Sequence, residues 1–86
     1  MNRLNEALVI LMEEASEVAQ AASKCIRFNE DKDYARLEEE IGDFMCLYEL
    51  LADKGIIDPA KVAMQVPLKR DKLKKWSSLY NGEEYV

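Results

Sequence analysis

Apolar and small residues recur along the first third of the chain at alternating steps of four and three positions. Side chains with this spacing lie on one face of an α-helix. The pattern therefore predicts an amphipathic helix over about residues 3–28, with an apolar seam that packs into a core. The seam consists of Leu4, Leu8, Leu11, Ala15, Val18, Ala22 and Cys25.

A second helix with the same kind of seam is predicted up to about Lys54. Asp31 or Asp33 can cap its first turn, and Gly55 is a natural stop at its end. The connection between the two helices is short, which predicts that they pack antiparallel. The second seam consists of Tyr34, Leu37, Ile41, Phe44, Tyr48 and Leu51.

Asp58 and Pro59 follow in the order of a helix N-cap and a first helical residue. Pro67 interrupts the helix that they begin, because an interior proline costs about 3 kcal/mol and disfavours helical geometry at the residue before it. We therefore expect two short helices there, at about 59–66 and 68–79.

No stretch of the chain alternates apolar and polar residues over a length useful for a strand. The predicted fold is all-α, with two long antiparallel helices and one or two shorter C-terminal helices that assemble into an oligomeric bundle. Residues 1–80 form one domain in this interpretation, and residues 81–86 form an extended or disordered tail.

Each long helix also carries two carboxylates three residues apart, displaced to the same side of its seam. These are Glu14 and Glu17 on the first helix and Glu40 and Asp43 on the second. One such pair usually marks a solvated helix face, but two pairs at matched angles with apolar neighbours predict a shared cleft. Carboxylates that converge there repel one another, and divalent cations relieve that repulsion.

Oxygen ligands favour Mg²⁺, Mn²⁺ or Ca²⁺ over zinc. Four acids suggest two or more ions shared with a phosphate ligand, because Mg²⁺ usually takes only one or two protein carboxylates. The chain has no histidine, which excludes imidazole ligands and Ser-His triads. Cys25 and Cys46 lack CxxC spacing and are expected to be buried free thiols.

The net charge of −5 opposes binding to nucleic acid polymers. Charge is uneven, since residues 1–54 hold thirteen acids and six bases while residues 55–86 hold four acids and six bases. Lys69 and Lys72, near the start of the last predicted helix, are candidates to bind pyrophosphate, with a general basic surface as the alternative.

No apolar run is long enough to cross a membrane, and the N-terminus lacks the features of a secretory signal. We therefore expect a cytoplasmic protein without membrane contact.

The sequence "EEASEVAQAASK", followed by "EEEIGD", resembles the ExxE…ExxD signature of the all-α nucleoside triphosphate pyrophosphohydrolases, the MazG-like and dimeric dUTPase superfamily. The resemblance covers about Glu13 to Leu51. It implies a hydrolase that depends on Mg²⁺, with Mn²⁺ as a possible substitute, and that releases a nucleoside monophosphate and pyrophosphate from a nucleoside triphosphate.

The resemblance also implies roles for single residues. The metal ligands and catalytic residues would be Glu14, Glu17, Glu40 and Asp43, and Lys24 would pair with a phosphate oxygen. Candidates for the base pocket are Phe28, Asn29 and Trp76, although packing is an alternative role for the tryptophan.

The short chain and additional apolar residues that we expect to be exposed predict a homodimer or homotetramer. These additional residues are Ile10, Met12, Leu47 and Leu50. Two other functions stay open: a helical dimerisation or adaptor module with acidic faces, and a relative that binds nucleotides without cleaving them.

Overall fold

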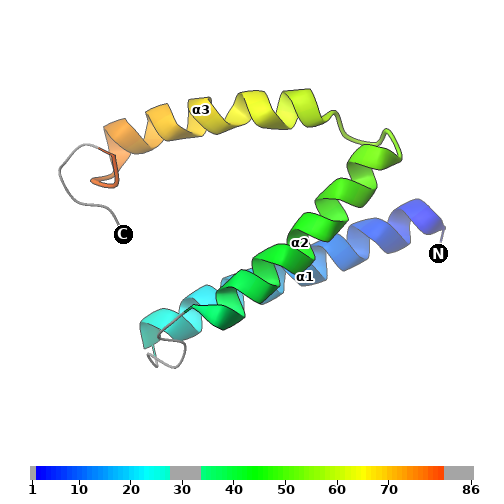
Figure 1. The fold of residues 1–86 in the computed structure, drawn as a ribbon, viewed down its shortest axis with the longest axis horizontal. Coiled ribbons are helices and arrows are strands. Elements are labelled where there is room, and N and C mark those ends of the chain that lie inside the picture. Colours follow the sequence, from blue (N-terminus) through cyan, green and yellow to red (C-terminus); the bar gives the residue numbers. More distant parts are fainter. Residues whose placement is uncertain (1, 28–33, 81–86) are drawn as a thin grey trace. The chain divides into compact units, whose positions relative to one another are not determined.

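The computed structural model describes residues 2–27 and 34–80. It contains three helices, α1 (Arg3–Arg27), α2 (Ala35–Asp53) and α3 (Pro59–Trp76), and no strand among these residues (Figure 1). The prediction of an all-α fold is confirmed. Within the same residues, no helix combines the length and apolar character that a bilayer crossing requires.

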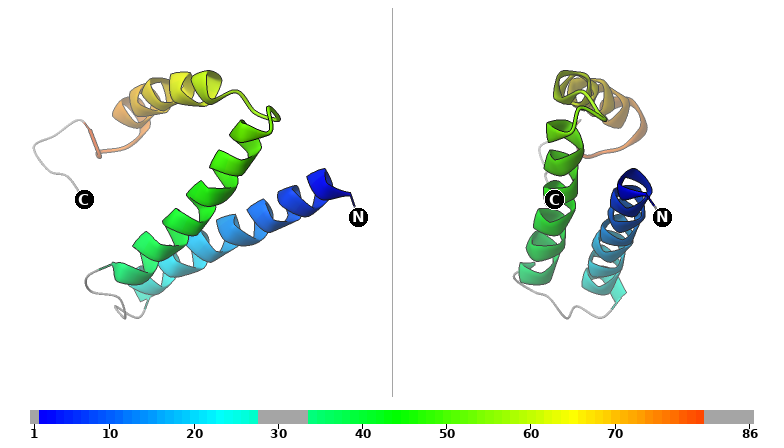
Figure 2. Two further views of the ribbon diagram at one scale, coloured as in Figure 1. Left: turned by 45° about the vertical axis from the view of Figure 1, so that its right-hand side comes forward. Right: turned by 90° about the vertical axis from the view of Figure 1, so that its right-hand side faces the viewer.

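The chain divides into two compact units, Met1–Lys54 and Gly55–Val86. The first unit is the pair α1 and α2, which run antiparallel and in contact, as predicted (Figure 2). The second unit contains α3. The bounds predicted for the two long helices agree with the structure to within a residue where the ends are described.

The contact between α1 and α2 buries one predicted seam residue, Leu51, and otherwise lies toward the acidic stripe. Ala7 and Ala21 are buried on α1, and Glu40 and Leu51 are buried on α2. With a single neighbour each helix can bury only one narrow stripe, and two small alanines allow the close approach there.

The predicted core seams are therefore partly wrong for the single chain. Leu4 (43%), Leu8 (37%) and Ile41 (44%) remain exposed. Ile10 and Leu47, which we expected to be exposed, are half-buried instead. Cys25 is half-buried and Cys46 is exposed, both as free thiols, so the expected burial of Cys46 is wrong.

Local signals at the helix ends agree with the structure. Gly55 has a left-handed φ of +72° directly after the C-cap of α2, a conformation that glycine adopts without steric cost. Asp58 accepts a hydrogen bond from the Ala60 N–H at 2.9 Å, and Pro59 is the first residue of α3. The predicted caps Asp31 and Asp33, and the tail at 81–86, lie outside the described residues.

The predicted break at Pro67 is wrong, because α3 continues through it. Proline removes one backbone bond, the one to the Ala63 carbonyl, and Ala63 is exposed so that water can satisfy its oxygen. Leu68, Lys69 and Arg70, which follow the proline, have high helix propensity. Each further residue adds a bond to a helix that has already formed.

Replacing Pro67 with alanine is expected to stabilise α3 locally by about 3 kcal/mol, because the substitution restores the bond to Ala63 and removes the ring clash. Native-state hydrogen exchange of the α3 amides measures this gain. The Lys61→Ala variant is the control, since it changes an exposed α3 residue that already has its N–H. Equal protection in all three proteins would contradict the expectation.

Candidate metal centre

Three carboxylates converge between α1 and α2. One oxygen from each of Glu14, Glu40 and Asp43 lies within 4.8 Å of the other two. Glu14 is half-buried, Glu40 is buried and Asp43 is exposed. The cluster is thus anchored in the helix contact and open to solvent on one side.

The helix geometry explains the convergence. Residues three apart on a helix are neighbours on its surface, so Glu40 and Asp43 point the same way from α2. The antiparallel contact between α1 and α2 brings Glu14 opposite that pair. Each half of the ExxE…ExxD pattern therefore contributes to one cluster, although the two halves lie 26 residues apart in sequence.

Arg36 forms a hydrogen bond with Glu40, the buried member of the cluster. Its Nε donates a hydrogen bond to Oε1 of Glu40 at 2.9 Å, one helical turn away. The Glu40 side chain is only 8% exposed, whereas that of Arg36 is 62% exposed. A buried carboxylate needs a hydrogen-bond partner, and Arg36 supplies one that fixes the orientation of the Glu40 side chain.

The cluster is electrostatically strained without a cation. Partial burial raises the pKa of Glu14 above its ordinary value, and the negative charges of Asp43, Glu40, Glu17 and Glu13 raise it further, in that order. The ionised form of Glu14 is therefore disfavoured in the folded protein.

This raised pKa predicts a pH dependence of stability in the absence of metal. The stabilisation linked to protonated Glu14 is complete below its ordinary pKa of 4.5 and is lost as the pH rises through the raised value. A Glu14→Gln variant, which resembles the protonated form, should match the wild type near about pH 4 and melt at a higher temperature near about pH 7. Thermal denaturation in the presence of a metal chelator, at both pH values, measures the difference in melting temperature between the variant and the wild type.

The control for this prediction is Glu13→Gln, a neighbouring exposed residue outside the cluster. Its melting temperature should differ from that of the wild type far less than that of Glu14→Gln does, because the Glu13 charge contributes least to the raised pKa of Glu14. A difference between Glu14→Gln and the wild type that stays constant with pH would contradict the prediction.

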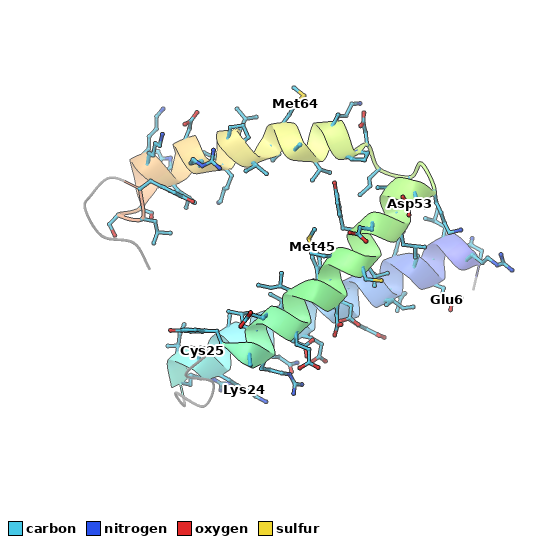
Figure 3. All side chains as sticks on the ribbon, viewed as in Figure 1. Glu6, Lys24, Cys25, Met45, Asp53 and Met64 are labelled. Atoms are coloured by element: carbon cyan, nitrogen blue, oxygen red, sulfur yellow. The ribbon has the colours of Figure 1, made fainter. Side chains whose placement is uncertain are left out.

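Glu17 lies outside the group of three but close to it, since its charge contributes to the raised pKa of Glu14. It lines a small polar hollow beside the cluster with Ala21, Lys24 and Arg36. Lys24 is exposed in the last turn of α1 (Figure 3). Lys24, which is predicted to bind a phosphate oxygen, thus borders the same hollow as Glu17, a predicted metal ligand.

Arg36 is the functional candidate that sequence reasoning missed. It lies on the acidic stripe four residues before Glu40, a spacing that favours an ion pair on a helix. That spacing was the available signal. It did not indicate that Glu40 would be the buried carboxylate of the cluster.

Three of the remaining predicted site residues lie on α3 in the second unit. Lys69 and Lys72 are exposed in the second half of α3, so their predicted position near the start of a helix is wrong, and Trp76 is 83% exposed at its end. Lys69 borders a hollow of about 490 Å³ whose walls include Val66 and Tyr80. Phe28 and Asn29 lie outside the described residues.

Comparison with known proteins adds no relative. The chain matches no family model, no curated protein and no solved structure. The likeness to the pyrophosphohydrolases rests on the motifs between Glu13 and Leu51.

Proposed function

We propose that this chain is a Mg²⁺-dependent nucleoside triphosphate pyrophosphohydrolase. The observation that supports the proposal most is the convergence of Glu14, Glu40 and Asp43 within 4.8 Å from two motifs distant in sequence. Both motifs contribute to this one cluster, Glu14 from α1 and Glu40 and Asp43 from α2.

The residues fit a divalent cation because they offer only hard oxygen donors, with one side open for water and substrate. Glu14, Glu40 and Asp43 would hold the ion, with Glu17 as a further ligand. When bound, Mg²⁺ would polarise the phosphoryl oxygens and make a water molecule nucleophilic at neutral pH.

The other residues of the first unit would bind and position the substrate. Arg36 orients Glu40 through the 2.9 Å hydrogen bond, and Lys24 would neutralise a phosphate oxygen beside Glu17. Water adds to the α-phosphorus, and the bond to the oxygen that bridges the α- and β-phosphates breaks. The products are a nucleoside monophosphate and pyrophosphate.

The proposal extends to partners and location. We place the enzyme in the cytoplasm as a homodimer or homotetramer. Phe28, Asn29 and Trp76 are the proposed residues for the base, and Lys69 and Lys72 are the proposed residues for the pyrophosphate. The acidic motifs do not determine which base and sugar the enzyme prefers, because that preference depends on the shape of the base pocket.

A substrate panel tests the activity. Purified protein is incubated with each ribo- and deoxynucleoside triphosphate and Mg²⁺, and both products are quantified. The expected result is equimolar monophosphate and pyrophosphate from at least one substrate, and none in the presence of chelator. Release of orthophosphate, or no turnover of any substrate, would refute the proposal.

A further inference from the structure

The hollow beside Lys69 runs along one side of α3, and we call it the α3 groove. It has a volume of about 490 Å³, and every residue that lines it belongs to the second unit. After α3 the chain turns at Ser77, whose Oγ accepts a hydrogen bond from the Leu79 N–H at 3.0 Å, and Tyr80 joins the lining (Figure 1). The lining residues are Val62, Gln65, Val66, Lys69, Arg70, Leu73 and Tyr80.

α3 buries none of its own residues. Val62 is 40% exposed and Val66 is 52% exposed, although both line the groove. A helix of 18 residues is only marginally stable by itself, because most helical stability in proteins comes from the packing of an apolar face. A surface that covers the α3 groove therefore stabilises α3.

The α3 groove carries positive charge without a matching acid. Lys69 lies within its apolar stripe, one turn after Val66, and Arg70 lies at its edge. Neither cation has an ion pair with any residue that the structure describes. Asp71 is the acid of α3, and it lies about 200° around the helix from Lys69, where it pairs with Lys74 at 3.9 Å. An occupant that buries Lys69 must therefore bring its own negative charge.

The shape of the α3 groove fits a helix better than a small ligand. Residues 62–73 extend about 16 Å along α3, which is about three helical turns. A small-molecule pocket encloses most of the surface of its ligand, whereas α3 is the one long wall of this groove. An amphipathic helix needs only such a wall, because it lays its apolar side along the groove and keeps its polar side in water.

We propose that the α3 groove binds an acidic amphipathic helix of another protein. Apolar side chains of the partner cover Val62 and Val66, and one of its carboxylates pairs with Lys69. This inference does not depend on the proposed activity. Lys69 is also one of the residues proposed for the pyrophosphate, so the groove accepts one of these two anions at a time.

A lipid surface fits the same groove less well. A helix that lies on a membrane keeps its bases on one polar side, but the bases of α3 are spread around the whole helix, and Lys69 falls within the apolar stripe. The bases of α3 are Lys61, Lys69, Arg70, Lys72, Lys74 and Lys75.

A designed peptide tests the inference on the full chain. The probe is a fluorescent helical peptide with leucines on one side and glutamates on the other, and a scrambled peptide of the same composition is its control. We expect the wild type to bind the helical peptide with a roughly micromolar Kd in fluorescence anisotropy. Lys69→Glu should weaken binding at least about 10-fold. Lys75→Glu makes the same charge change at an exposed position outside the groove, and its Kd should stay within a few-fold of the wild type.

Lys69→Gln provides a second measurement if Lys69→Glu does not fold. It removes the charge without reversing it, so binding should be weaker and should depend less on ionic strength than in the wild type. Equal losses in Lys69→Glu and Lys75→Glu, or equal binding of the scrambled peptide, would overturn the inference. Absence of peptide binding would also overturn it, and binding to vesicles of phosphatidylcholine and phosphatidylserine instead would assign the groove to a lipid surface.

Discussion

An Asp43→Asn variant should release pyrophosphate at least about 100-fold more slowly than the wild type. Asparagine keeps the size of the side chain but removes the negative charge that the cation requires. Asp43 is exposed, so the substitution leaves no cavity and should not unfold the chain. The initial rate of pyrophosphate release at saturating Mg²⁺ measures the loss.

Two neighbouring glutamates serve as matched controls. Glu13→Gln and Glu39→Gln remove the same charge one residue away from Glu14 and Glu40, at exposed positions outside the cluster. Both should keep rates within a few-fold of the wild type. If Asp43→Asn and these controls are equally active, the acidic cluster is not the catalytic centre.

Glu17→Gln addresses the fourth predicted ligand. Glu17 lies outside the group of three, beside Lys24 and Arg36. A loss as large as that of Asp43→Asn would support direct metal binding. A smaller loss, mainly in KM, would instead assign Glu17 to the substrate side of the site.

The second large effect expected is on stability. Mg²⁺ at about 100 times its Kd should stabilise the wild type by about 2.7 kcal/mol, which raises the melting temperature of a domain this small by about 10 °C or more. Binding to the native state alone produces this shift. Differential scanning fluorimetry with increasing Mg²⁺ measures it, and Asp43→Asn should abolish it.

Without metal, removing one of these carboxylates should raise the melting temperature. In chelator the three carboxylates repel one another, so removing one charge by Glu14→Gln should raise the melting temperature above that of the wild type. Glu13→Gln is again the control. No response to Mg²⁺ in any of these proteins would favour the adaptor function over the hydrolase.

Local chemistry predicted the helix ends well. Asp58, Pro59 and Gly55 act through their own backbone or a neighbouring N–H, so they need no knowledge of distant residues. The convergence of Glu14 with Glu40 and Asp43 was also predictable. It requires two antiparallel helices whose carboxylate pairs lie on the same side of their seams and at matching positions along the contact. Glu17, which was predicted to join them, lies outside the group of three.

Three other features could not be predicted from the sequence. Periodicity identifies an apolar seam on α1 but not which surface covers it, and for Leu8 the structure shows that α2 does not. Pro67 has an unfavourable local cost that a formed helix tolerates. The role of Arg36 depends on the burial of Glu40, which is a property of the helix contact.

The ion pair between Arg36 and Glu40 also sets the charge balance of the proposed centre. The proposed ligands Glu14, Glu17, Glu40 and Asp43 contribute four formal negative charges, and the Arg36 guanidinium contributes one positive charge. One divalent cation leaves a single negative charge, and a second would carry the site to a net positive charge unless the phosphates of a nucleotide entered with it. The number of ions bound would then depend on the substrate: one in the resting enzyme, and more only when the triphosphate is present.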